Sequence, residues 1–186
     1  TTENKIRRLD NFMVIKSKES KLIKIDFKKI IDDLNLDKNL VSSAHIITKF
    51  SSSKIPSRIK FGLNIGIEKS KSKLPCNICF NSKMGNPNID SKPGSFHWAP
   101  IFVQNSVVTI SNFSSKKNYT KDATVELKFY RKEDSTTISK EIKLKPFSEF
   151  RLTLDDDLKN FLKEDGWVTI KSNNPYIQGF YFVFHP

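Results

Sequence analysis

Apolar and polar positions alternate most clearly in the second half of the chain. Residues 123–130 alternate strictly over eight positions, and this period of two predicts a half-buried strand. Similar short patterns predict further strands at 107–113, 138–145, 150–154, 167–171 and 179–184. Between them, residues 155–163 place apolar side chains at helical spacing behind an aspartate cap. Six short strands with one short helix predict a β-sandwich.

The first half repeats part of this order. Residues 20–26 align with 148–154, and a helical pattern follows at 27–34. A strand at 44–50, a Ser-rich turn and an alternating strand at 60–65 complete the series. The order strand, short helix, strand, turn, strand therefore occurs twice. We expect a mainly β protein with antiparallel β-sandwiches built from two related copies of this unit.

The two copies imply three segments. We expect residues 1–68 to form a first, incomplete sandwich copy and residues 102–186 to form the second copy. Residues 69–101 are then the segment that connects the two copies. The strands missing from the first copy either lie upstream of Thr1 or are supplied by a single sandwich that both copies complete. Alternation at 74–80 predicts one strand inside the connection. Its remainder, Asn81–Pro100, is a predicted linker or binding loop, because long structureless connections are usually one or the other.

Part of the second copy resembles a known class. Ser111-Asn112 at a strand end, then Val125–Phe129, Lys145-Pro146-Phe147-Ser148 and Gly166–Pro175 resemble the bacterial immunoglobulin-like or fibronectin-like β-sandwich modules. The resemblance extends from Val107 to Phe184. It implies a sandwich fold with an adhesive, scaffolding or ligand-binding role. The compartment stays open, with a secreted or cell-surface location favoured over a cytoplasmic one.

Charge leaves two alternatives open. The 186 residues include 32 Lys+Arg and 20 Asp+Glu, for a net charge of +12. Most of the excess lies in residues 1–90, scattered in singles and pairs. Ordinary solvated faces explain this distribution, and a polyanion site is the alternative. No apolar run approaches the roughly 20 residues that span a bilayer, so we expect no membrane-spanning segment.

Candidate catalytic and metal chemistry is sparse. Cys76-Asn77-Ile78-Cys79 has the spacing of half a zinc site, but no second Cys pair follows and the histidines lie outside finger spacing. On an alternating strand, Cys76 and Cys79 face opposite sides. Cys76, Cys79 and His97 are thus only weak metal candidates, and we expect no metal or cofactor. Since no catalytic motif occurs, we expect no enzyme, the alternative being an unrecognised site around His97 and Cys79.

The densest unusual segment is Gly94–Pro100, with two aromatic residues and a histidine between Gly and Pro. Phe96, His97 and Trp98 are candidate binding residues, because aromatic side chains anchor recognition surfaces. Alternatively, Trp98 fills one end of the core and His97 faces solvent.

We expect a partner to contact Asn81–Pro100 and not the open sheet faces, which carry Lys128, Lys143 and Lys171 outward. The leading hypothesis is a non-enzymatic β-sandwich binding module, part of a larger surface or assembly protein, with a protein or carbohydrate partner. The alternative is a basic protein that binds nucleic acid, lipopolysaccharide or an anionic membrane surface. The sequence predicts no oligomeric state.

Overall fold

A computed structural model describes most of the second half of the chain and parts of the first. The described residues are 8–10, 12–16, 19, 25–37, 45–47, 60–65, 76–81, 88–134 and 136–183, with the backbone alone for 60–65 and 76–81. They fall into two compact units, one within Ile46–Ser91 and the other within Thr1–His45 and Lys92–Pro186.

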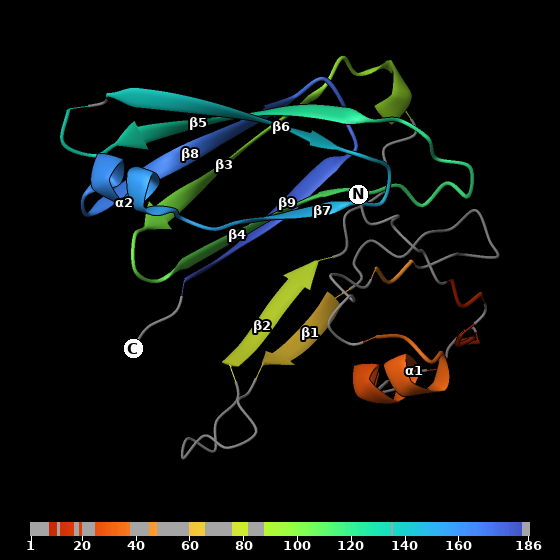
Figure 1. Ribbon diagram of the computed structural model, residues 1–186. Helices are drawn as coiled ribbons and strands as arrows, with labels where there is room; N and C mark the ends of the chain where they lie inside the picture. The colour runs from red at the N-terminus through yellow and green to blue at the C-terminus, as the bar shows by residue number, and fades with distance from the viewer. Residues whose placement is uncertain are drawn as a thin grey trace. The chain divides into compact units, whose positions relative to one another are not determined.

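The larger unit contains two antiparallel sheets, one over the other (Figure 1). The four-stranded sheet has the order β3 (Ser95–Phe102), β8 (Asp165–Ser172), β5 (Ala123–Arg131) and β6 (Thr137–Leu144). The three-stranded sheet has the order β7 (Glu149–Leu152), β4 (Ser106–Asn112) and β9 (Ile177–Val183). All neighbouring strands are antiparallel. The prediction of a mainly β, antiparallel sandwich is confirmed.

Every second residue of β5 fills the space between the sheets. Val125, Leu127 and Phe129 are fully buried and belong to one apolar cluster with Val108 and Ile110 of β4. The intervening β5 residues are half-buried or exposed, as the period-two pattern predicts for a strand with one covered face. The core therefore lies between the sheets.

Helix α2 (Asp156–Leu162) closes one end of this core (Figure 1). The carboxylate of Asp155 accepts a hydrogen bond from the backbone N–H of Leu158 at 2.9 Å, so it caps the first turn. Leu158 and Leu162 face the sheets and are buried in the core. The predicted helix at 155–163 is confirmed.

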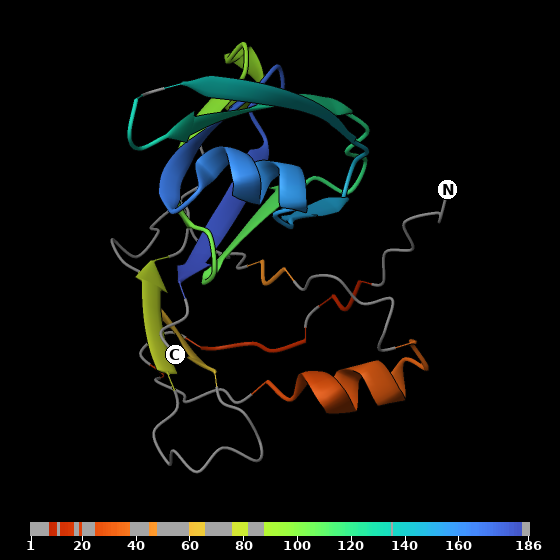
Figure 2. The same cartoon turned by 60° about the vertical axis from the view of Figure 1, so that its left-hand side comes forward.

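Within the part of residues 1–68 that the structure describes, the elements of the predicted first copy form no second sandwich. Helix α1 (Phe27–Asp33) occurs where expected but buries no side chain. Strand β1 (Lys60–Ile65) also occurs as predicted, but among the described strands its partner is β2 (Cys76–Asn81), in a two-stranded sheet (Figure 2). Residues 45–47 are not in a strand, and most of 20–26 and 44–50 lies outside the described residues. The two-copy prediction is not confirmed.

Neither of the two described α-helices, at seven residues each, is long or apolar enough to cross a membrane.

The outer strands differ in placement from those of an immunoglobulin sandwich. In that fold the first strand pairs with the second, and the last strand pairs with the sixth. Here the first sandwich strand, β3, pairs with β8, and the last strand, β9, pairs with β4. Membership in the immunoglobulin-like class stays a prediction.

Part of the predicted linker is a strand. Residues Ser95–Phe102 form β3 and pair with β8 along their whole length, so the prediction of a loop over Asn81–Pro100 is wrong from Ser95 onward. The predicted boundary between residues 101 and 102 falls inside β3. Pro100 fits there because β3 is an edge strand, where a missing N–H costs no ladder hydrogen bond on the open side.

Candidate functional site

Strand β3 separates the three predicted binding residues. Its side chains alternate, so Phe96 and Trp98 face outward and are each 64% exposed. His97 points to the other side, where its Nε2 lies 3.0 Å from the carbonyl oxygen of Ile177. The alternative that Trp98 fills the core while His97 faces solvent is therefore wrong. Phe96 and Trp98 share one surface, and His97 instead links two strands.

The outward side chains of β8 and β5 extend this surface. In the register, Trp98 lies opposite Thr169, and Pro100 lies opposite Trp167, which in turn lies opposite Tyr130 of β5. The rings of Tyr130 and Trp167 are parallel within 8°, with centroids 5.3 Å apart. We call Phe96, Trp98, Trp167 and Tyr130 together the aromatic face.

Trp167 and Tyr130 were not among the predicted site residues. The alternation of 123–130 already placed Tyr130 with the polar, outward residues of its strand, which is a usable signal. Trp167 could be joined to it only through the pairing of β5 with β8, and strand pairing is not visible in a single sequence.

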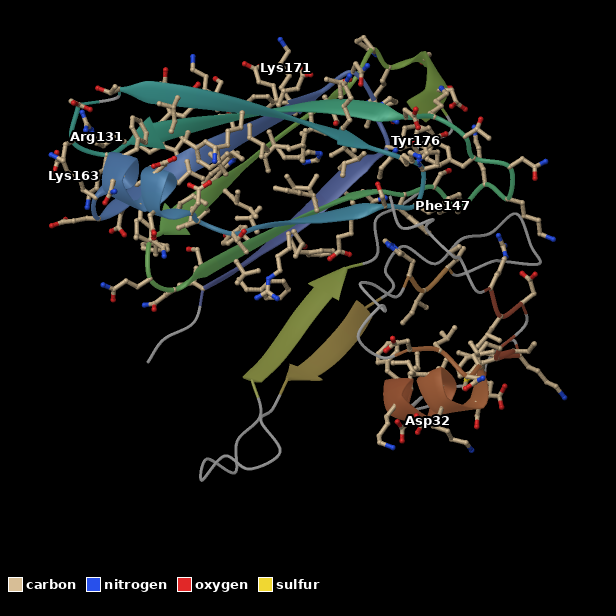
Figure 3. The ribbon with its side chains drawn as sticks, viewed as in Figure 1. Asp32, Arg131, Phe147, Lys163, Lys171 and Tyr176 are labelled. Carbon is tan, nitrogen blue, oxygen red and sulfur yellow. The ribbon has the colours of Figure 1, made fainter. Side chains whose placement is uncertain are left out.

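Charged side chains share the same sheet surface with the rings. Lys128, Lys143 and Lys171 face outward, as the alternation predicts, and Figure 3 shows Lys171 pointing away from the sandwich. The Lys128 ammonium lies 5.3 Å from the centroid of the Tyr130 ring, within cation–π range. Glu126 lies between Lys171 of β8 and Glu141 of β6 in one cross-strand row. The surface thus combines exposed rings with charges of both signs.

A groove runs along the open side of the sandwich between the edge strands β3 and β9. It has a volume of about 160 Å³, and Trp98 lies at its rim as well as on the aromatic face. Its lining is mainly apolar and includes Ala99, Val108, Ile110, Ile170 and Ile177. Trp98 therefore borders two surfaces that a ligand can contact, the outer surface of the sheet and the groove.

The loops at one end of the sandwich are fixed by a buried polar network. The Asn112 side-chain amide donates to the carbonyl oxygens of Lys121 at 2.8 Å and Leu144 at 3.1 Å. The Tyr119 hydroxyl donates to Asn112 Oδ1 at 2.6 Å, and the Asn174 amide donates to the Tyr119 oxygen at 2.8 Å. These bonds join the β4–β5, β6–β7 and β8–β9 connections into one rigid end.

Lysines surround this end. The ammonium groups of Lys116 and Lys121 lie 5.6 and 5.9 Å from the centroid of the buried Tyr176 ring. Lys117 and Lys145 are exposed on the same connections. Figure 3 shows Tyr176 and Phe147 at this end and Arg131 and Lys163 at the other. We call Lys116, Lys117, Lys121 and Lys145 the basic end.

The weak metal candidates are not brought together by any described geometry. Strand β2 covers both cysteines, with position 76 opposite Ile65 and position 79 opposite Gly62, so the two positions fall on opposite faces of the strand. Within the described ranges, no three His, Cys, Asp or Glu residues are grouped so that they could hold a metal ion.

Comparison with known proteins adds no relative: no family model, no curated protein and no solved structure matches this chain.

Proposed function

We propose that the protein is a non-enzymatic β-sandwich binding module that engages its partner through the aromatic face. The observation that carries this proposal is the exposure of Phe96 and Trp98, 64% each, at neighbouring outward positions of one strand. Aromatic side chains that stay exposed to solvent contribute little to the stability of the fold. Grouped on a rigid sheet, such rings are typical of recognition surfaces.

The rigidity of the sheet supports the same proposal. Two inward residues of β3, Ala99 and Ile101, are at most 2% exposed, and β8 pairs with every residue of the strand. The backbone beneath Phe96 and Trp98 is therefore fixed by the core, and little conformational entropy remains to be lost when a partner binds.

Unbiased ligand selection tests this proposal. A random-peptide phage library and a printed oligosaccharide array are each presented to the full chain. We expect ligands selected by the wild type to bind the Phe96→Ala/Trp98→Ala double variant about tenfold or more weakly, as truncation of central aromatic residues does. Phe27→Ala is the matched control, because Phe27 is an exposed ring that belongs to helix α1 and not to the aromatic face. Equal affinity of every selected ligand for wild type and double variant would contradict the proposal.

A second candidate function, polyanion binding, is favoured by the basic end. Four lysines on loops locked together by the Asn112–Tyr119–Asn174 network present a preformed positive surface. Binding of a single-stranded oligonucleotide should then weaken steeply with salt, and each phosphate-contacting lysine removed should lower the slope of log K against log salt by about 1. Lys117→Glu is the test variant, and Lys143→Glu on the outer sheet surface is its charge-matched control.

A further inference from the structure

We propose that the aromatic face binds an uncharged glycan chain, with the rings of Phe96 and Trp98 as stacking surfaces. The inference rests on the proposed function, since it names the ligand class of the same surface. Three properties of the surface lead to it: the free ring faces, the balance of charge and the hydrogen-bonding groups beside the rings.

The rings differ in what they can offer a ligand. Tyr130 and Trp167 stack on each other and are half-buried, so each already uses one ring face. Phe96 and Trp98 are exposed over most of their surface. Two residues along a strand separate them by about 6.8 Å, which places two apolar plates in series. The C–H-bearing face of a sugar ring is apolar and packs on such plates, because the ring faces carry partial negative charge.

The charge on this surface favours a neutral ligand. Among the described residues, its outward charged side chains are three lysines and three carboxylates: Lys128, Lys143, Lys171, Glu126, Glu141 and Asp165. Glu126 lies directly opposite Lys171 in the register. A nucleic acid gains its affinity mainly from net positive charge, which a balanced surface does not supply. An uncharged ligand does not depend on net positive charge for its affinity, so the balanced charge of this surface does not weaken its binding.

The polar groups beside the rings match hydroxyls. Lys171 lies opposite Phe96, and Thr169 lies opposite Trp98. An ammonium donates hydrogen bonds, a carboxylate such as Glu126 accepts them, and a threonine hydroxyl does both. Sugar hydroxyls also donate and accept, so they find complementary groups at Lys171 and Thr169, one strand spacing from the rings, and at Glu126, one strand further. A purely apolar ligand would leave these groups unused.

An extended peptide fits the same strand less well. Adding a strand to the open edge of β3 requires a continuous row of backbone donors and acceptors. Pro100 interrupts that row, since it has no N–H, and proline is a common guard of sheet edges. A ligand that lies on the ring faces is not affected by Pro100.

The test measures binding of the full chain to neutral oligosaccharides of glucose, xylose, mannose and galactose, with a heparin fragment as the acidic comparator. We expect at least one neutral oligosaccharide to bind. Its affinity should be similar at about 0.05 and 0.5 M NaCl, because the oligosaccharide carries no charge whose attraction to the protein salt could screen. Phe96→Ala and Trp98→Ala should each weaken it, and the double variant should weaken it about tenfold or more. Lys171→Ala should weaken it less, and Phe27→Ala should leave it unchanged.

Three outcomes would overturn the glycan inference: no neutral oligosaccharide binds, only the heparin fragment binds, or the double variant binds a neutral oligosaccharide as tightly as the wild type. Circular dichroism of the double variant shows whether it is folded, and the single variants replace it if it is not. The proposed function is judged separately. If no neutral oligosaccharide binds but a phage-selected peptide binds the double variant more weakly than the wild type, the aromatic face is still the binding surface and only its glycan ligand is rejected.

Discussion

The imidazole Nε2 of His97 lies 3.0 Å from the carbonyl oxygen of Ile177, and this contact joins the edge strands of the two sheets. Because a carbonyl only accepts, Nε2 must carry the hydrogen. The side chain that sequence reasoning grouped with the binding residues thus connects β3 to β9 across the open side of the sandwich.

Replacing this histidine should affect stability more than binding. His97→Ala removes a hydrogen bond between the sheets and should lower the free energy of unfolding by about 0.5–1.5 kcal/mol. Urea unfolding followed by circular dichroism measures the change. The folded variant should bind ligands of the aromatic face as the wild type does. Unchanged stability together with lost binding would instead make His97 a ligand contact.

The two faces of β3 should respond oppositely to truncation. Trp98→Ala removes a ring that is 64% exposed and should change the free energy of unfolding by no more than about 0.5 kcal/mol. Ile101→Ala, on the buried face of the same strand, should cost about 2–5 kcal/mol. The two variants share their strand but differ in burial, so burial is the main cause of the expected difference. A Trp98→Ala loss as large as that of Ile101→Ala would show that the ring supports the fold.

This contrast also explains why the sandwich was easier to predict than the site. On β5, one face is apolar and the other polar, so residues 123–130 show their period directly. On β3, both faces carry apolar side chains: Ala99 and Ile101 point inward, and Phe96 and Trp98 point outward. Alternation is therefore hidden, and Gly94 and Pro100 give the segment the composition of a loop.

The buried network could not be predicted for a different reason. Asn112 and Asn174 have the composition of turn residues, and each lies beside a turn. Their burial, at no more than 2% exposure, arises because three connections distant in sequence meet at Tyr119. The local sequence pattern indicates each turn, but it does not indicate that these connections contact one another in the fold. The repeat prediction rested on local pattern in the same way: β1 resembles β9 in its alternation, but it pairs with β2 whereas β9 pairs with β4, so the repeat is not confirmed.

The cap of α2 should make stability depend on acid pH. The pKa of Asp155 is held below its ordinary value, first by the hydrogen bond from Lys140 at 2.6 Å and then by the Leu158 amide. Such a lowered pKa stabilises the fold above the unfolded-state pKa near 4, and this stability is lost as pH falls through the folded-state pKa.

Asp155→Ala should therefore unfold at lower urea than the wild type at pH 7, and the two midpoints should converge as the pH falls well below about 4. Asp157→Ala, in the same helix, is the control and should stay close to the wild type. A constant difference between Asp155→Ala and wild type across this pH range would show that the cap does not act through the charge of Asp155.

The Tyr119 hydroxyl should govern stability at alkaline pH. Burial raises the pKa of Tyr119 above its ordinary value of 10.0, so folding favours the protonated phenol. The contribution of the protonated hydroxyl to stability is fully present below the unfolded-state pKa and is lost as pH rises through the folded-state pKa.

Tyr119→Phe leaves Asn112 and Asn174 short of a hydrogen-bond partner and should lower the free energy of unfolding by about 1–3 kcal/mol at pH 7. This deficit relative to wild type should shrink above pH ~10, because the wild type then begins to lose what the variant already lacks. Urea midpoints measured from neutral to alkaline pH follow it, with Tyr130→Phe on the outer surface as the control. A deficit that persists unchanged at alkaline pH would show that ionisation of the Tyr119 hydroxyl does not destabilise the fold, and it would contradict the prediction.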